Sequence, residues 1–172
     1  MTNSDSNIDI SQNVTKMSQQ ALAQIMNNST SKIKIIETLP ELLIIEDDDL
    51  VIKSLLRMTR RFAQSVIATR STVEGLTLIG QLSENSLVIS DIDNKLDKDL
   101  SGMDVAAQSW PVRKPKKIPF ILVSGAIDSH KAQIKQLTSQ GIVNGTVEKP
   151  MSSSELYDQI QSVHLRSIHS LG

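Results

Sequence analysis

"SLVISDIDNKLDKDLSG" (86–102) joins an aliphatic run directly to a cluster of acids. Residues 87–89 have the pattern of a short strand that is covered on both faces, because no polar residue interrupts them. Asp91 and Asp93 follow at once, and two further acids stand a few residues later. A buried strand that ends in carboxylates indicates a site at the edge of a sheet rather than a solvated loop.

The same pattern occurs in "ELLIIEDDDL" (41–50), and an alternation of strands and helices extends from it to the end of the chain. Apolar runs predict strands at 42–45, 65–68, 87–89, 119–123 and 145–148. Helical periodicity follows each run, and Ser71 with Glu74 and Ser152 with Glu155 form capping boxes at two helix starts. Five strand–helix pairs predict an α/β fold, with a parallel sheet between helices and right-handed crossovers.

The connections carry further signals. "PVRKPKK" (111–117) is expected to be a solvated basic loop, because prolines interrupt it. Asp128 is placed to cap a helix, and Gly141 stands where that helix should stop. His130, His164 and His169 have no partner at a meaningful spacing and are expected on the surface.

Composition excludes several classes of protein. The length of 172 residues suits one domain with an extension, and the net charge of −1 provides no basic field for nucleic acid or an acidic membrane. The lack of cysteine excludes disulfides, zinc–thiolate sites and cysteine nucleophiles, and it suits a reducing cytoplasm. The sequence has no signal-peptide pattern and no apolar run near the roughly 18 residues of a membrane helix.

The N-terminal part differs in composition from the rest of the chain. Residues 1–40 are rich in Ser, Asn, Gln and Thr and form an extension, whereas 41–172 form the predicted domain. The first ten residues have the composition of a disordered segment. Within 11–27, apolar residues recur at helical spacing and predict an amphipathic helix. Such a helix could dock on its own domain or pair two chains, and the sequence leaves both open.

Ligands of parallel α/β sheets bind beyond the carboxyl ends of the strands. Four of the five predicted strands carry polar residues at that position. They are Glu46, Asp47 and Asp48 after the first strand, Asp91 after the third, Ser124 and Gly125 after the fourth, and Lys149 and Pro150 after the fifth. Because these residues come from four separate parts of the chain, we expect them to form one site.

The residue types indicate phosphoryl chemistry. Carboxylates crowded within about 4 Å repel by several kcal/mol, and a hard divalent cation such as Mg²⁺ relieves the repulsion. A metal beside a central carboxylate neutralises the oxygens of an incoming phosphoryl group. Lys149 supplies a second positive charge, and a small hydroxyl residue can hydrogen-bond the group. Asp91 is then the expected nucleophile in a covalent aspartyl-phosphate mechanism.

Four segments resemble the receiver domain of two-component response regulators. "LLIIEDDDL" is similar to its first strand with the acidic pair, and "LVISDID" to the strand that bears the phospho-accepting aspartate. "ILVSG" and "EKP" are similar to the ends of its fourth and fifth strands. The resemblance covers about 41–165 and implies a flavodoxin-like, doubly wound sheet of order 2-1-3-4-5.

On this resemblance the chain is a cytoplasmic, stand-alone response regulator and not an enzyme. It would accept phosphate from a sensor histidine kinase or a histidine phosphotransfer protein and then contact a downstream protein target. Only a short tail follows the last predicted helix, so we expect no output domain. From the net charge and the lack of a long apolar run we expect no direct contact with nucleic acid and no membrane association. The N-terminal extension offers a route to a homodimer.

The resemblance also implies a role for each site residue. Asp91 would accept the phosphoryl group, and Ser124 and Lys149 would contact it. Mg²⁺ would be held by Asp91, directly by Asp47, by Glu46 through water and by the main-chain carbonyl of Asp93. A register shifted by one would make the acidic pair Asp47 and Asp48; we prefer Glu46 because it directly follows Ile45.

Three features depart from the receiver pattern. No Met-Pro pair follows Asp91, and Gly102 lies eleven residues after it, so the intervening loop is three residues longer than usual. Thr146 stands where receivers carry an aromatic that moves on activation. A degenerate receiver that only binds partners is therefore an alternative.

Two enzyme classes share part of the motif. The Asp91-x-Asp93 pair resembles the opening motif of haloacid-dehalogenase-like phosphatases, whose second acidic pair follows that motif, whereas here it precedes it. Glu46 with Asp91-x-Asp93 is similar to the Toprim domain of primases and topoisomerases. Neither Ser124 nor Lys149 is required in that class.

Overall fold

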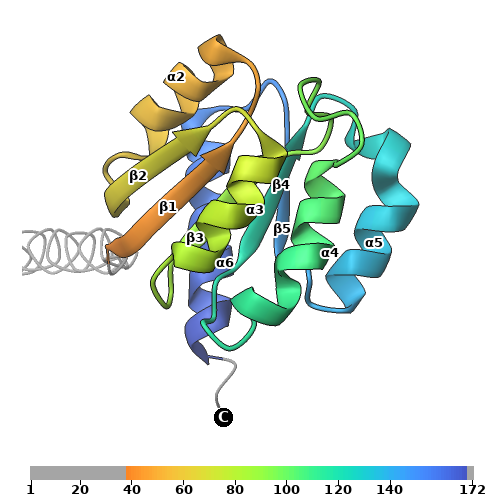
Figure 1. The fold of residues 1–172 in the computed structure, drawn as a ribbon. Helices are drawn as coiled ribbons and strands as arrows, with labels where there is room; N and C mark the ends of the chain where they lie inside the picture. The colour runs from red at the N-terminus through yellow and green to blue at the C-terminus, as the bar shows by residue number, and fades with distance from the viewer. Residues whose placement is uncertain (1–37, 170–172) are drawn as a thin grey trace, which may run out of the picture. The chain divides into compact units, whose positions relative to one another are not determined.

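The computed structural model describes residues 38–169, and the amphipathic helix predicted at 11–27 lies outside this range. The elements are β1 (Leu39–Ile45), α2 (Asp49–Thr59), β2 (Ala63–Thr69), α3 (Thr72–Gln81), β3 (Leu87–Asp91), α4 (Gly102–Arg113), β4 (Phe120–Ser124), α5 (Lys131–Ser139), β5 (Gly145–Glu148) and α6 (Ser153–His169). All strand pairs are parallel, and the order is β2-β1-β3-β4-β5 (Figure 1). The predicted flavodoxin-like sheet is confirmed.

Helices cover both faces of the sheet and form two apolar cores. Side chains of β1 alternate between them: Leu43 and Ile45 pack with α3, α4 and α5, whereas Leu42 and Ile44 pack with α2 and α6. Period-two alternation sends successive side chains to opposite faces, so a strand between two helix layers must be apolar on both. This requirement explains the uninterrupted aliphatic runs in the sequence.

Strand register aligns the carboxyl ends that carry the polar residues. Ile45 of β1 pairs with Ser90 of β3, so Glu46 and Asp91 come next on adjacent strands. On the other side, Ser124 of β4 pairs with Glu148 of β5, which directly precedes Lys149. Since the strands are parallel, all these ends lie at one edge of the sheet.

Element boundaries differ from prediction mainly at strand ends. β1 begins at Leu39, two residues before the expected domain start at 41, and β3 continues through Asp91. Gly141 has a φ of +74° just after α5, as expected of a residue that ends a helix. Asp128 does not cap α5: it lies in a 3₁₀-helix, Ile127–His130, that leads into it.

The basic segment 111–117 is only partly a loop, which corrects the sequence expectation. α4 continues through Pro111 to Arg113, and the Arg113 side chain is fully buried. Its guanidinium donates hydrogen bonds to main-chain carbonyls, including that of Ala106 in α4 itself. These bonds draw the last turn of the helix into the core, although its composition is that of a solvated loop.

The surface placement expected for the histidines is also wrong for His164, which is 4% exposed on α6. The C-terminal part of α6 packs against the core, with Val163 fully covered beside it. The side chain of His169 lies outside the described residues.

Candidate functional site

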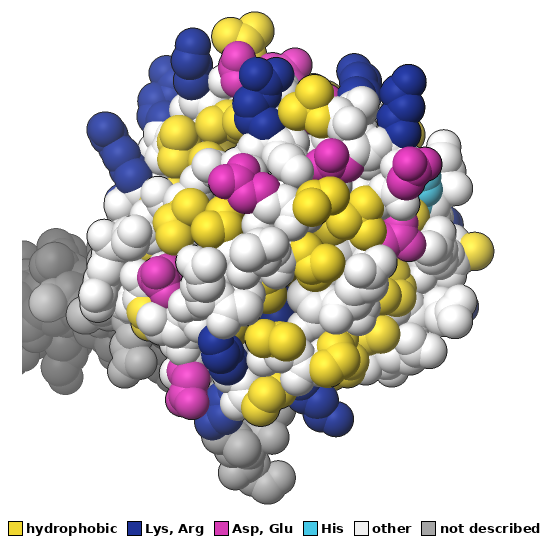
Figure 2. Space-filling model, viewed as in Figure 1, with side chains coloured by type: hydrophobic (Ala, Val, Ile, Leu, Met, Phe, Trp, Pro, Cys, Tyr) yellow, Lys and Arg dark blue, Asp and Glu magenta, His cyan; other side chains and the backbone are white. Residues whose placement is uncertain are grey.

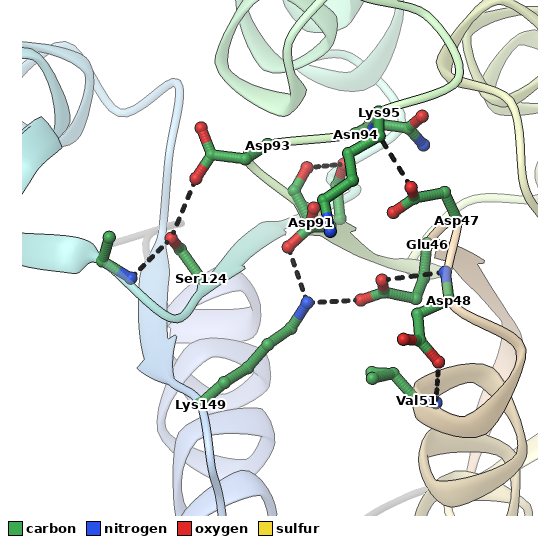
Figure 3. A network of polar contacts seen from close by, with 12 residues as sticks. Glu46, Asp47, Asp48, Val51, Asp91, Asp93, Asn94, Lys95, Ser124 and Lys149 are labelled. Atoms are coloured by element: carbon green, nitrogen blue, oxygen red, sulfur yellow. Dashed lines mark hydrogen bonds and ion pairs between the residues drawn. The ribbon is translucent and has the colours of Figure 1, made fainter.

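Lys149 connects two carboxylates at the carboxyl edge of the sheet (Figure 3). Its Nζ lies 2.6 Å from Glu46 Oε2 and 2.7 Å from Asp91 Oδ1. The Glu46 and Asp91 side chains are only 2% and 7% exposed, and Lys149 is 22% exposed. Charges held this far from water are screened weakly, so the electrostatic interactions among these three groups are strong.

The pKa shifts follow from this arrangement. Burial raises the pKa of Glu46, Lys149 opposes that rise, and the charge of Asp91 adds to it. Burial alone would lower the pKa of Lys149, but its bonds to Asp91 and Glu46 outweigh that effect and raise it. Lys149 is therefore held as a cation between two acids and serves as their internal counter-ion.

Glu46, Asp47 and Asp91 form a group that suits a metal ion. One carboxylate oxygen from each lies within 4.8 Å of the other two. Three hard, anionic oxygen ligands at this separation suit Mg²⁺, which binds through a few carboxylates and retains water. Asp48, the alternative member of the acidic pair, instead caps α2: its Oδ1 accepts from the backbone N–H groups of Leu50 and Val51.

Two contacts hold Asp47 in position. The backbone N–H of Lys95 donates to Asp47 Oδ2 at 3.1 Å, and Arg70 Nε donates to the Asp47 carbonyl at 3.2 Å. Asn94 links these partners, because its amide donates to the Arg70 carbonyl at 2.7 Å. The long loop after β3 therefore reaches across to the loop after β1.

Asp97 anchors that loop to α3. Its Oδ2 accepts hydrogen bonds from the N–H groups of Thr72 and Val73 and from the hydroxyls of Ser71 and Thr72. These bonds, Ser71 first, lower the pKa of Asp97. The acid thus acts as a second N-cap for α3, which satisfies N–H groups that the helix leaves unpaired. Asp97 is therefore a structural residue of the loop and not an acid that only faces water.

Asp93 and Ser124 form a second part of the site. Ser124 Oγ donates to Asp93 Oδ2 at 3.3 Å and accepts from the backbone N–H of Ala126 at 3.0 Å. His130 Nε2 lies 3.1 Å from Asp93 Oδ1, so this histidine has the partner that sequence spacing did not reveal. The Asp93 carboxylate points toward the β4–α5 loop and lies outside the metal group; the resemblance assigns only its main-chain carbonyl to Mg²⁺.

Thr146 lies on β5 at the wall of a cavity of about 640 Å³. Glu148, Glu155 and Asp158 also line it, so the wall is acidic. Thr146 pairs with Leu122 in the sheet, two residues before Ser124. The small side chain leaves open space at the edge strand where receivers carry a ring.

The structure brings together residues that the sequence predicted and adds others. Glu46, Asp47, Asp91 and Lys149 form one cluster, with Ser124 and Asp93 beside it. Sequence reasoning missed the Lys95 backbone, Asn94, Arg70, Asp97 and His130, which join the loops around that cluster. The extra length of the 91–102 loop was a signal for Asn94, Lys95 and Asp97, whereas no sequence pattern marked Arg70 or His130.

Solved structures with the same fold are mostly receiver domains. A response regulator receiver domain from Clostridium thermocellum aligns with a TM-score of 0.61 at 19% identity, over 76% of this chain and 98% of its own. The receiver domain of a sensor histidine kinase from Pseudomonas aeruginosa, with a magnesium ion coordinated in its active site cleft, gives 0.59 at 16% identity, over 74% and 98%. A protein from Rhodopirellula baltica described as an adenylate cyclase gives 0.64 at 15% identity, over 75% and 90%.

The chain therefore has the fold of a response regulator receiver domain. No protein-family model and no curated protein sequence matches it. Among the helices of residues 38–169, none has the length and apolar character needed to cross a membrane.

Proposed function

We propose that this protein is a receiver that accepts a phosphoryl group on Asp91 within a two-component phosphorelay. The observation that carries the proposal is the bridge from Lys149 to Glu46 and Asp91, with Asp47 beside them. Three acids and one lysine at the carboxyl ends of β1, β3 and β5 match what a carboxylate needs to receive a phosphoryl group and hold it. A structural ion pair would need one acid for the lysine, and this site gathers three.

Asp91 is the nucleophile in this proposal. Lys149 binds Oδ1 of Asp91. Oδ2 of Asp91 makes no hydrogen bond within residues 38–169 and is available for attack. Asp91 Oδ2 forms a bond to phosphorus as the bond from phosphorus to the donor histidine nitrogen breaks, and the electron pair stays on that nitrogen. The Lys149 ammonium and the Ser124 hydroxyl then hold the phosphoryl oxygens by charge and hydrogen bonding.

Glu46, Asp47 and Asp91 would hold Mg²⁺, with the main-chain carbonyl of Asp93 as a further ligand. A bound Mg²⁺ neutralises phosphoryl oxygens as charge develops. The backbone N–H of Lys95 donates to Asp47 Oδ2 and holds this carboxylate beside the other two acids, which suits Asp47 as a metal ligand. Asp47→Asn is expected to weaken Mg²⁺ binding, since it removes a hard anionic ligand.

The phosphoryl donor is a sensor histidine kinase or a histidine phosphotransfer protein. An apolar groove of about 460 Å³ lies between α2 and the loop that joins β5 to α6, and Lys149 is one of the residues that line it. Leu50, which lines the groove, is 75% exposed, so its side chain is accessible to a docking partner. A helical donor that docks in this groove would bring its phosphohistidine to Asp91.

The decisive experiment is phosphoryl incorporation from acetyl phosphate with Mg²⁺, followed by intact mass and peptide mapping. One labile phosphoryl group on Asp91 is expected, and Asp91→Asn should abolish it while the exposed Asp99→Asn should leave it unchanged. Lys149→Ala should retain Mg²⁺ binding but lose phosphorylation or the response to it. Label on a histidine or serine, or full label in Asp91→Asn, would refute the mechanism.

Other results would identify the rival classes. Repeated turnover of a phosphate ester would indicate a phosphatase, and cleavage of DNA would indicate a Toprim enzyme. If no phosphoryl label appeared at all, the protein would be a degenerate receiver.

The docking groove has its own test. Leu50→Ser should slow transfer from a phosphorylated histidine phosphotransfer protein but not from acetyl phosphate, because only the protein donor uses the groove. Val112→Ser is the matched control, since Val112 is also an exposed aliphatic residue, 43% exposed, but lies on α4. Equal slowing by both variants would exclude the groove as the docking surface.

A further inference from the structure

Another cavity lies at the amino-terminal ends of the strands, whereas the acidic cluster lies at their carboxyl ends. Its volume is about 370 Å³, within the range of sites for small molecules. It is formed where α4 ends and where β4 and β5 begin, and its lining includes Trp110, Arg113, Lys114, Lys117, Pro119 and Asn144. In Figure 2, Lys and Arg side chains gather with apolar ones at the lower end of the molecule, which is this end of the strands.

Arg113 places a positive charge in the wall of this cavity without a carboxylate to balance it. The guanidinium donates to Ser109 Oγ and to the carbonyls of Ala106, Ile118 and Ile142, at 2.8–2.9 Å. Within residues 38–169 it forms no ion pair, and burial lowers its pKa to about 9. A buried cation is costly unless a negative charge accompanies it. Carbonyl dipoles compensate part of this charge, and the guanidinium also lies over the rings of Trp110 and Phe120, 5.4 Å and 4.7 Å from their centroids.

Two further cations add positive charge to the wall of the cavity. Lys114 and Lys117 line the cavity, and none of the described residues that line it is acidic. Lys116, between them, is committed elsewhere, because its Nζ donates to the carbonyls of Gly80 and Leu82. The rest of the wall is mainly apolar and includes the ring of Pro119 and the indole of Trp110, with Lys114 Nζ 5.8 Å from the centroid of the indole. A ligand that suits this lining combines a negative charge with a flat apolar group.

We infer that this cavity binds a small organic anion that carries a flat ring. The ring would lie against the indole and proline surfaces, and the carboxylate or phosphate would face Lys114 and Lys117. This inference accounts for the basic segment 111–117, which the phosphoryl site does not use. It is independent of the proposed function, because the two sites lie at opposite ends of the strands.

Trp110 makes a direct test possible, since it is the single tryptophan of the chain and lies in the cavity wall. The full-length protein is titrated with adenosine monophosphate and with benzoate, which separate phosphate from carboxylate ligands, while tryptophan fluorescence is recorded. Adenosine and benzyl alcohol serve as neutral counterparts of the same ring systems. Saturable change with at least one anion, and weaker binding of its neutral counterpart, is the expected result.

Variants then locate the site. Lys114→Gln and Lys117→Gln should each weaken anion binding by about two- to five-fold, the effect of losing one exposed ion pair. Lys131→Gln on α5 is the matched control and should bind as the unaltered protein does. These surface changes are used because Arg113→Met could unfold the chain. A lack of saturable change with both anions, equal binding of neutral ligands, or unchanged binding in both cavity variants would overturn the inference.

Discussion

Gly102→Ala is expected to destabilise the fold and to disturb the acidic cluster together. Gly102 begins α4, and its backbone N–H donates to the Ile92 carbonyl at 3.0 Å. A Cβ at this position would lie 2.0 Å from the Asp91 carbonyl oxygen and 2.9 Å from Ser90 Oγ. The first obstacle is backbone and cannot rotate away, so α4 and the end of β3 must separate by more than about 1 Å to reach an ordinary contact distance.

The size of the effect follows from two opposing contributions. Overpacking of this kind costs about 1–3 kcal/mol, whereas alanine gains less than about 1 kcal/mol of helix propensity over glycine. The net loss is about 1–2 kcal/mol of unfolding free energy, which lowers the urea midpoint by about 0.5–1 M. Because the displaced atom belongs to Asp91, its 2.7 Å contact with Lys149 should lengthen, and phosphoryl incorporation should fall even where the variant is fully folded.

Equilibrium urea unfolding and acetyl phosphate labelling at low temperature measure the two effects separately. Gly80→Ala is the control, because a Cβ there meets nothing within 4 Å in α3. That change should stabilise the protein by about 0.5–1 kcal/mol and leave labelling unaltered. If Gly102→Ala were as stable as the unaltered protein and labelled normally, the close packing of α4 against Asp91 would be refuted.

Three further predictions concern the loops and the extension. Asp97→Asn should lower the melting temperature at neutral pH, with Asp99→Asn as its control. Hydrogen bonding lowers the pKa of Asp97 in the folded state, so the stability that its charge contributes is present above the unfolded pKa and is lost as pH falls through the folded pKa. The melting temperatures of Asp97→Asn and the unaltered protein should therefore converge in acid. A difference in melting temperature that stays constant with pH would exclude the charge of Asp97 as the cause. Deleting residues 1–31 should change the oligomeric state or lower the melting temperature, because a short apolar stripe must be buried against something; unaltered light scattering and melts would mean that the extension packs on nothing. With Thr146 in place of a ring, activation should move the 124–127 loop, and NMR comparison of the free and phosphoryl-analogue-bound forms would expose an unmoved loop.

The sheet and the acidic cluster could be predicted because each depends on short, local patterns. A strand covered on both faces must be aliphatic throughout, so its run and its end are visible in the sequence. Once the strands are placed, the parallel topology brings Glu46, Asp91 and Lys149 to one edge.

The remaining contacts depend on loops that meet only after folding. Asp97 caps α3 from a position 25 residues away from Thr72, and no pattern of residue types marks such a pair. Asp93 and His130 are likewise brought together by the loops after β3 and β4. Arg113 shows the same limit: its burial depends on carbonyls of Ile118 and Ile142, which the fold supplies, while its neighbours in the sequence resemble a solvated loop.

The position of β2 at the edge of the sheet has a consequence for solubility. Within residues 38–169 only β1 pairs with it, so the outer hydrogen-bonding groups of Ala63–Thr69 can template another chain. This strand contains no charged residue, which is the composition that favours edge-to-edge aggregation. Arg60 and Arg61 precede it and Arg70 follows it, all three exposed. These arginines act as gatekeepers, since a second copy of the strand in parallel register would place like charges side by side.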